Sequence, residues 1–138
     1  MWVFDFEAPL NAIQIASEAS LLLRLDTVRR GRFGAFILST SCDADIAPQL
    51  WIQISGAYAY VHFFTDVSGA DPGCQACGMQ AADCPDEVRF IQIGEAEDAL
   101  GNTMPGHTLC SLEDSYQAAL DFFRHPESMP SRINWVPL

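Results

Sequence analysis

The sequence predicts an α+β fold, with a mainly antiparallel sheet and two helices packed on one face. β-prone runs outnumber helical ones, and only Gly56-Ala57 separates two of them, as in a hairpin. Two other segments carry apolar residues at helical spacing, without the regular strand–helix alternation of a parallel sheet. The chain has 138 residues and shows no linker, repeat or low-complexity segment, so we expect one domain over residues 1–138.

The N-terminal segment predicts two short strands. Trp2–Phe6 alternates, with its aromatic residues on one side, which is typical of a strand. Pro9-Leu10-Asn11 favours a turn. Ala12–Ala16, in which Ile13 and Ile15 share a side, predicts the second strand.

A first helix is expected next, capped by Ser17 or Ser20 and running to about Arg30. Gly31 then suits the end of the helix. The apolar positions that follow helical spacing are Leu21, Leu22, Leu25 and Val28.

Three strands follow this helix. Ala35–Thr40 is the first, and Asp43–Pro48 is expected to turn the chain. Leu50–Ser55 alternates apolar with polar residues, and Tyr58–Thr65 is strongly β-prone. The two-residue connection at Gly56-Ala57 makes this pair the predicted hairpin.

The middle of the chain predicts less regular structure. Asp66–Glu87 is rich in glycine and proline and is expected to be one long irregular stretch, the kind that is often functional. Val88–Ile93 predicts a strand. Glu95–His107 is acidic and contains several turn residues, so we expect turns there.

The second helix has the clearest local signals. Ser111-Leu112-Glu113-Asp114 predicts a cap with acids in the first turn, and His125-Pro126 ends the helix. Its apolar stripe comprises Leu112, Tyr116, Ala119, Leu120 and Phe123. We expect the stripe to lie on the sheet, so truncation of Leu120 or Phe123 to Ala should cost about 2–5 kcal/mol. Ile133–Val136 predicts a last strand.

The charge balance is strongly acidic. Eighteen carboxylates and seven basic residues, all of them Arg, give a net charge of −11. Eleven carboxylates and only Arg89 fall between Asp66 and Asp121, so this stretch carries −11 + 1 = −10. Such a chain repels nucleic acid and anionic lipid, and it attracts a basic partner. The alternative is that the charge serves solubility alone.

Neither a secretion signal nor a membrane span is predicted. The N-terminus has no basic region, and no apolar run approaches the roughly 20 residues that a span needs. We therefore expect a cytoplasmic protein whose five cysteines are mostly reduced.

Three cysteines have a spacing that is compatible with a metal site. Cys74, Cys77 and Cys84 could share one structural Zn²⁺, with the first two in a tight turn. The fourth ligand would come from His62, His107, Cys42 or Cys110. The alternative is an irregular loop whose cysteines are incidental. A thioredoxin-like redox role is disfavoured, because no helical pattern follows the pair.

No catalytic motif is present, and we expect that the protein is not an enzyme. The sequence contains no phosphate-binding loop, dinucleotide fingerprint, HExxH or GxSxG motif. His62 sits in an apolar strand, where a packed residue is more common than a base. His125 suits the C-terminal end of a helix, a structural role. A Cys–His nucleophile pair has no local signature.

Several segments have a recognisable order and spacing: Gly106–Ser111, the helix Tyr116–Phe123, Pro130, the ending Ile133–Leu138 with its Trp135, and, in the middle, Pro48–Leu50 and Tyr58–Phe64. In this order and spacing the chain resembles the first-numbered (immunity protein 1) type among the immunity proteins of bacterial polymorphic toxin systems. Residues 106–138 fit the family pattern well, whereas the loop of Ala70–Asp86 departs from it. On another interpretation, Trp135 is only a core anchor.

The resemblance implies a protein that binds and neutralises a cognate toxin, often a deaminase that acts on nucleic acids. Such a toxin needs a basic groove, which an acidic inhibitor can fill. The partner-binding residues that we expect are Asp66, Asp71, Asp83, Asp86, Glu95, Glu97 and Asp98, with Tyr58 and Tyr60 as aromatic contacts. The alternatives are a small zinc-bound adaptor domain that uses the cysteine loop, and an enzyme that uses a Cys or His there.

Overall fold

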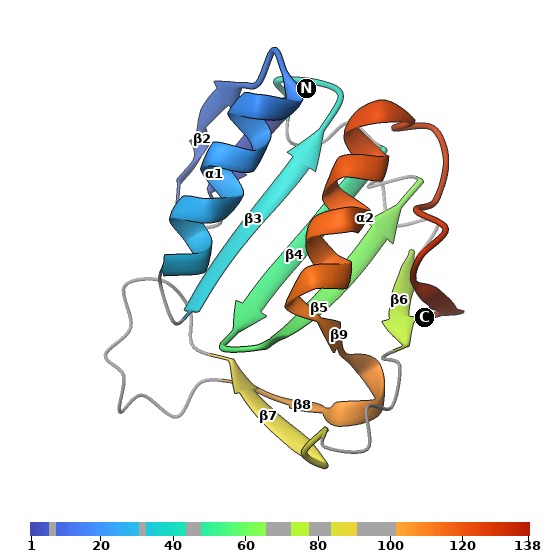
Figure 1. The fold of residues 1–138 in the computed structure, drawn as a ribbon. Helices are drawn as coiled ribbons and strands as arrows, with labels where there is room; N and C mark the ends of the chain where they lie inside the picture. The colour runs from blue at the N-terminus through green and yellow to red at the C-terminus, as the bar shows by residue number, and fades with distance from the viewer. Residues whose placement is uncertain (6–7, 31–32, 44–47, 66–72, 78–83, 91–101) are drawn as a thin grey trace.

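The computed structural model describes residues 1–5, 8–30, 33–43, 48–65, 73–77, 84–90 and 102–138 (Figure 1). In chain order the elements are β1 (Trp2–Asp5), β2 (Ala8–Gln14), α1 (Glu18–Arg30), β3 (Phe33–Ser39), β4 (Gln49–Ser55), β5 (Tyr58–Phe64), β6 (Cys74–Cys77), β7 (Glu87–Phe90), β8 (Asn102–Pro105), the 3₁₀ turn η1 (Gly106–Thr108), β9 (Cys110–Ser111), α2 (Leu112–Arg124) and β10 (Asn134–Pro137).

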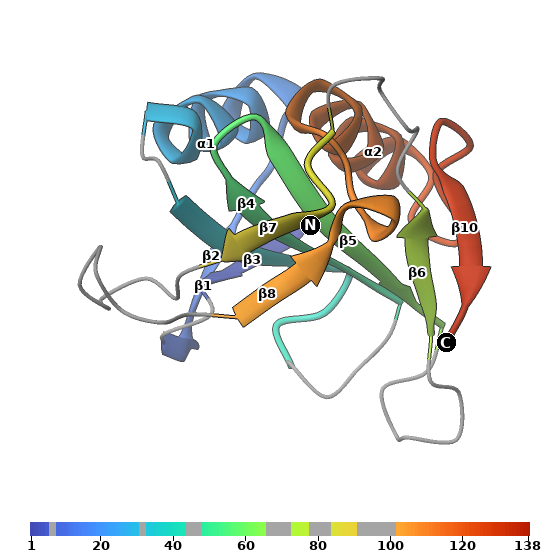
Figure 2. The ribbon, with the colours of Figure 1, turned by 90° about the horizontal axis from the view of Figure 1, so that it is seen from below.

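One antiparallel sheet forms the centre of the molecule. Its strands lie in the order β10-β6-β5-β4-β3-β1-β2, and the short β9 pairs with β5. β7 and β8 form a separate antiparallel hairpin. Both helices lie side by side on the same side of the sheet (Figures 1 and 2). The predicted fold class, a mainly antiparallel sheet with two helices on one face, is therefore confirmed.

The core lies between this sheet face and the two helices. The alternation along each strand turns one set of side chains inward, and the central members of this set are at most 3 % exposed: Phe36, Leu38, Leu50, Ile52, Ile54, Ala59, Val61 and Phe63. The helices cover them with Leu21 and Leu25 from α1 and with Ala118 and Phe122 from α2. Burial of this apolar surface is the main stabilising contribution to the fold.

The β4–β5 hairpin follows the sequence prediction closely. Its two strands pair along their whole length, from Gln49 opposite Phe64 to Ser55 opposite Tyr58. Gly56 in the two-residue loop has a φ of 60°, a conformation that favours glycine. The loop also anchors α2, because the amide of Leu112 donates to the carbonyl of Ala57 at 2.9 Å.

The N-terminal caps of both helices are confirmed, whereas Gly31, the predicted stop of the first helix, lies outside the described residues. The Ser17 hydroxyl accepts a hydrogen bond from the amide of Ser20 at 3.2 Å, so Ser17 is the capping residue of α1. The Ser111 hydroxyl accepts from the amide of Asp114 at 3.0 Å at the start of α2. His125 follows the last residue of α2, as the sequence predicted.

Three local predictions are wrong. Pro9-Leu10-Asn11 lies within β2 and is not a turn; β2 is an edge strand, where a proline's missing N–H costs no ladder bond. The stretch Asp66–Glu87 contains a strand, β6, which lies between β5 and β10. The predicted turns of Glu95–His107 give way to β8, which pairs with β7. Pairing with β5 and β10 stabilises β6, and pairing with β7 stabilises β8, despite the weak local β-propensity of both segments.

In the part of the chain that the structure describes, no helix is long and apolar enough to cross a membrane.

Candidate functional site

Aromatic side chains gather on the sheet face opposite the helices. The outward positions of β4 and β5 carry Trp51, Tyr60, His62 and Phe64, all partly exposed, and we call these four residues the aromatic platform. Their rings are in contact: the centroids of Trp51 and Phe64 are 4.9 Å apart, those of Tyr60 and His62 4.4 Å, and those of His62 and Phe64 5.7 Å. A pre-packed group of partly exposed rings is suited to binding, because the rings lose little conformational freedom when a partner binds.

The β7–β8 hairpin borders this platform. The Ser55 hydroxyl, at the end of β4, donates to the carbonyl of Arg89 in β7 at 2.6 Å. A hollow of about 240 Å³ lies between the hairpin and the platform, and we call it the platform hollow; its lining residues are Trp51, Gln53, Tyr60, His62, Asn102 and Met104. The site therefore combines residues from three strands, of which β8 is distant in sequence.

The register of the hairpin decides which of its side chains meet the sheet. Asn102 and Met104 line the hollow, and they pair with Phe90 and Val88 on the same side of the hairpin. Arg89 pairs with Thr103, so it lies on the opposite side. The cation of the hairpin is therefore turned away from the hollow.

The titratable groups of the platform hollow are neutral at pH 7. Burial lowers the pKa of His62, so its imidazole is uncharged. Burial raises the pKa of Tyr60, so its phenol keeps its proton. The lining residues thus provide aromatic faces, a thioether and neutral polar groups, but no formal charge.

Two polar groups in the hollow are available to a ligand. In the described part of the chain, neither the Gln53 amide nor the Tyr60 hydroxyl makes a hydrogen bond. The Nε2 atom of His62 also has no hydrogen-bond partner there, but it is buried. The Trp51 indole is held in place differently, because its Nε1–H donates to Oε1 of Gln49 at 2.7 Å. The arrangement of apolar walls and a few polar groups is typical of a recognition site.

The structure places three of the nine predicted partner-binding residues. Tyr58 and Tyr60 lie on the outer face of β5, half-buried, and Asp86 is exposed just before β7. The other six lie outside the described residues: Asp66, Asp71, Asp83, Glu95, Glu97 and Asp98. Sequence reasoning missed Trp51 and His62, although their outward positions in the predicted hairpin were a usable signal.

The cysteine segment does not have the geometry that a zinc site was expected to use. Cys74–Cys77 forms the extended strand β6, not a tight turn. Cys84 lies elsewhere, with its thiol donating to the carbonyl of Gly106 at 3.6 Å. Among the described residues, no group of three or more His, Cys, Asp or Glu side chains could hold a metal ion. A structural zinc remains an untested prediction, now without the turn on which it was based.

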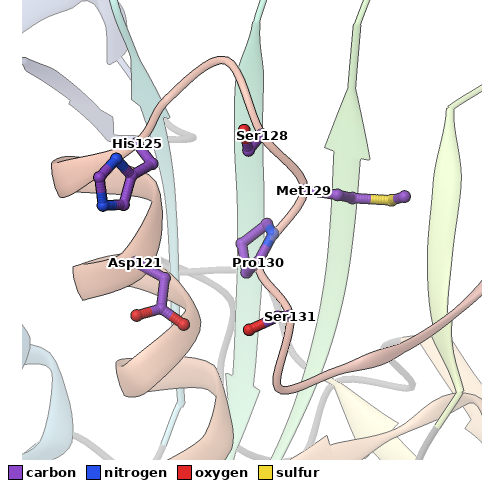
Figure 3. Close-up of a pocket in the computed structure, with 6 residues that line it drawn as sticks. All are labelled: Asp121, His125, Ser128, Met129, Pro130 and Ser131. Atoms are coloured by element: carbon purple, nitrogen blue, oxygen red, sulfur yellow. The ribbon is translucent and has the colours of Figure 1, made fainter.

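A second hollow, of about 270 Å³, lies at the end of α2 (Figure 3). It is lined by Asp121, His125, Ser128, Met129, Pro130 and Ser131, which include the residue types of a hydrolase triad. The hydrogen bonds there are made by the backbone. The amide of His125 donates to the carbonyl of Asp121 at 2.8 Å, and the amide of Ser128 donates to the carbonyl of His125 at 3.0 Å. Within the described residues, no side-chain hydrogen bond links the imidazole to the carboxylate or to a hydroxyl, so no activated nucleophile is assembled.

The fold and site define an α+β protein with a partly exposed aromatic sheet face. In comparison with known proteins, the chain matches no family model and no curated protein sequence. The resemblance to the immunity family therefore stays a prediction. Trp135, one of its residues, has a structural role here: its ring is 6.1 Å from that of Phe63, and its Nε1–H donates to the carbonyl of Pro130 at 2.7 Å.

Proposed function

We propose that this chain is a binding protein that neutralises a bacterial toxin, acting as an immunity protein. In this role it covers the active site of a basic toxin domain, such as a nucleic-acid deaminase. The observation that carries the proposal is the aromatic platform, a set of packed, partly exposed rings on the sheet face opposite the helices. Aromatic residues of this kind are enriched at the centres of protein interfaces, where they provide most of the binding energy.

The charge of the chain supports a basic partner. A net charge of −11 accelerates the approach of a cationic protein and disfavours nucleic acid. A toxin that grips a polyanion has a groove lined by Lys and Arg. An acidic inhibitor can occupy that groove with carboxylates, while its aromatic side chains provide the buried anchors.

The first experiment is a pull-down from source cells with this protein as bait, followed by mass spectrometry. We expect one basic toxin domain to be retained and to survive washing at high salt, because aromatic anchors are not screened as surface charges are. Purified toxin should then lose its activity when the protein is added. Retention of no toxin domain, or retention without inhibition, would overturn the proposal.

Two variants test whether the platform is the binding surface. Trp51→Ala combined with Tyr60→Ala should weaken toxin binding roughly 30-fold or more, as loss of interface anchors does. Leu23→Ala is the matched control, because Leu23 is 70 % exposed on α1, on the helical side of the sheet. Equal binding by both variants, with both folded, would show that the toxin binds elsewhere.

A further inference from the structure

The platform hollow has the size of a single side chain. Its volume of about 240 Å³ lies below the roughly 300–1,000 Å³ of pockets that enclose drug-sized ligands. It is open at the sheet surface between β8 and the platform, so a side chain of a docked protein can enter it. We infer that the platform hollow binds an arginine side chain of the protein partner. This inference rests on the proposed function, because it names the anchor that the toxin inserts.

The walls of the hollow suit a guanidinium group. The rings of Trp51 and Tyr60 provide negative π faces, on which a planar cation stacks favourably. The amide oxygens of Gln53 and Asn102 and the oxygen of Tyr60 are acceptors for guanidinium N–H groups. Of the polar lining groups, the Gln53 amide and the Tyr60 hydroxyl make no hydrogen bond within the described residues, so both are available to a ligand.

The charge and the aromatic lining of the hollow favour arginine over anionic ligands and over lysine. No lining residue is cationic, and the hairpin register turns Arg89 away, so no positive charge there would attract a phosphate or a carboxylate. A cationic side chain, in contrast, is attracted by the net charge of −11 that the whole chain carries. The aromatic lining favours the planar guanidinium over the compact, strongly hydrated ammonium of lysine.

The test uses the protein alone, with small probes and NMR detection. N-acetyl-arginine amide should cause saturable shifts in Trp51, Tyr60 and Met104, with a dissociation constant in the millimolar range that suits so small a ligand. N-acetyl-citrulline amide has the same shape without the charge and should bind at least about tenfold weaker. The lysine analogue should also bind more weakly than the arginine probe. Absence of saturable shifts, equal binding of citrulline or lysine, or shifts centred elsewhere would overturn the inference.

Variants on two different strands keep the test decisive even if one of them fails to fold. Tyr60→Ala on β5 and Met104→Ala on β8 should each weaken the arginine probe several-fold, and Leu23→Ala should not. If either Tyr60→Ala or Met104→Ala fails to fold, the other variant still shows whether the arginine probe binds in the hollow. The toxin pull-down is a separate measurement: if a toxin is retained but the probe does not bind, only the arginine site fails, whereas probe binding without any toxin removes only the immunity proposal.

Discussion

The hydroxyl of Tyr116 on α2 donates a hydrogen bond of 3.0 Å to the carbonyl of Leu25 on α1. Both residues belong to the core, and they lie 91 positions apart in the sequence. The bond ties the two helices together on the sheet face that they share. The relative position of the helices is thus fixed by a buried polar contact in addition to apolar packing.

Replacement of Tyr116 by Phe should lower the free energy of unfolding by about 0.5–1.5 kcal/mol, because the ring stays while the hydrogen bond to Leu25 is lost. Tyr60→Phe is the matched control: its hydroxyl makes no hydrogen bond within the described residues, so its removal should change stability little. Urea denaturation of both variants checks the prediction. Equal losses, or none for Tyr116→Phe, would contradict it.

The aromatic ring of Phe122 should be the most costly to remove from α2. Phe122 is fully buried, and its ring meets that of Phe63 edge-on at 6.2 Å. Phe122→Ala should therefore cost about 3–5 kcal/mol of unfolding free energy, whereas Leu23→Ala on the exposed side of α1 should stay within about 0.5 kcal/mol. Thermal or urea denaturation measures both. A smaller loss for Phe122→Ala than for Phe123→Ala would contradict this view of the core.

The sequence pattern of α2 identified most of its buried residues but not Phe122. Helical spacing correctly selected Tyr116, Ala119 and Leu120, which are all buried. It also selected Phe123, which is only partly buried, and missed Phe122. Two adjacent phenylalanines cannot both face a sheet, and the choice between them depends on how the helix is rotated by its long-range contacts. Local periodicity does not contain that information.

Local sequence patterns also omit the long-range contacts that form parts of the sheet and of the site. The β4–β5 hairpin and both helix caps depend on neighbouring residues, so the sequence predicted them. β6 forms because β5 and β10 lie on either side of it, which its own four residues do not indicate. Likewise, Tyr60 was predicted as a contact residue, but the hollow beside it needs Met104, which arrives from a distant hairpin.

Cys110 should be the slowest to react of the thiols whose exposure the structure describes. Burial, with a further contribution from Asp114, raises its pKa to about 12, and its thiol donates to the carbonyl of Ala59 at 3.6 Å. Because the thiolate is the reactive form, iodoacetamide should modify the exposed Cys42 first and leave Cys110 intact in the folded protein. Peptide mass spectrometry over time follows each site. Labelling of Cys110 at the rate of Cys42, before unfolding, would contradict its burial.

His62 should make the protein less stable as the pH falls below neutrality. Burial lowers its pKa from the ordinary value of 6.5 in the folded state, whereas the unfolded chain keeps that value. As the pH decreases through 6.5 towards the folded pKa, the unfolded state therefore binds more protons at this site than the folded state does. Linkage then requires the free energy of unfolding to decrease over that window, and requires no contribution from His62 well above pH 6.5.

His62→Gln removes this contribution and leaves the other titrating groups in place. The variant's absolute stability can differ from that of the wild type. The relevant quantity is therefore the decrease in the free energy of unfolding between pH 7.5 and a pH of about 5, measured for each protein by urea denaturation. We expect this decrease to be larger for the wild type than for His62→Gln. If both proteins lose the same amount, His62 is not held neutral by burial, and the platform is more open to water than its packed rings imply.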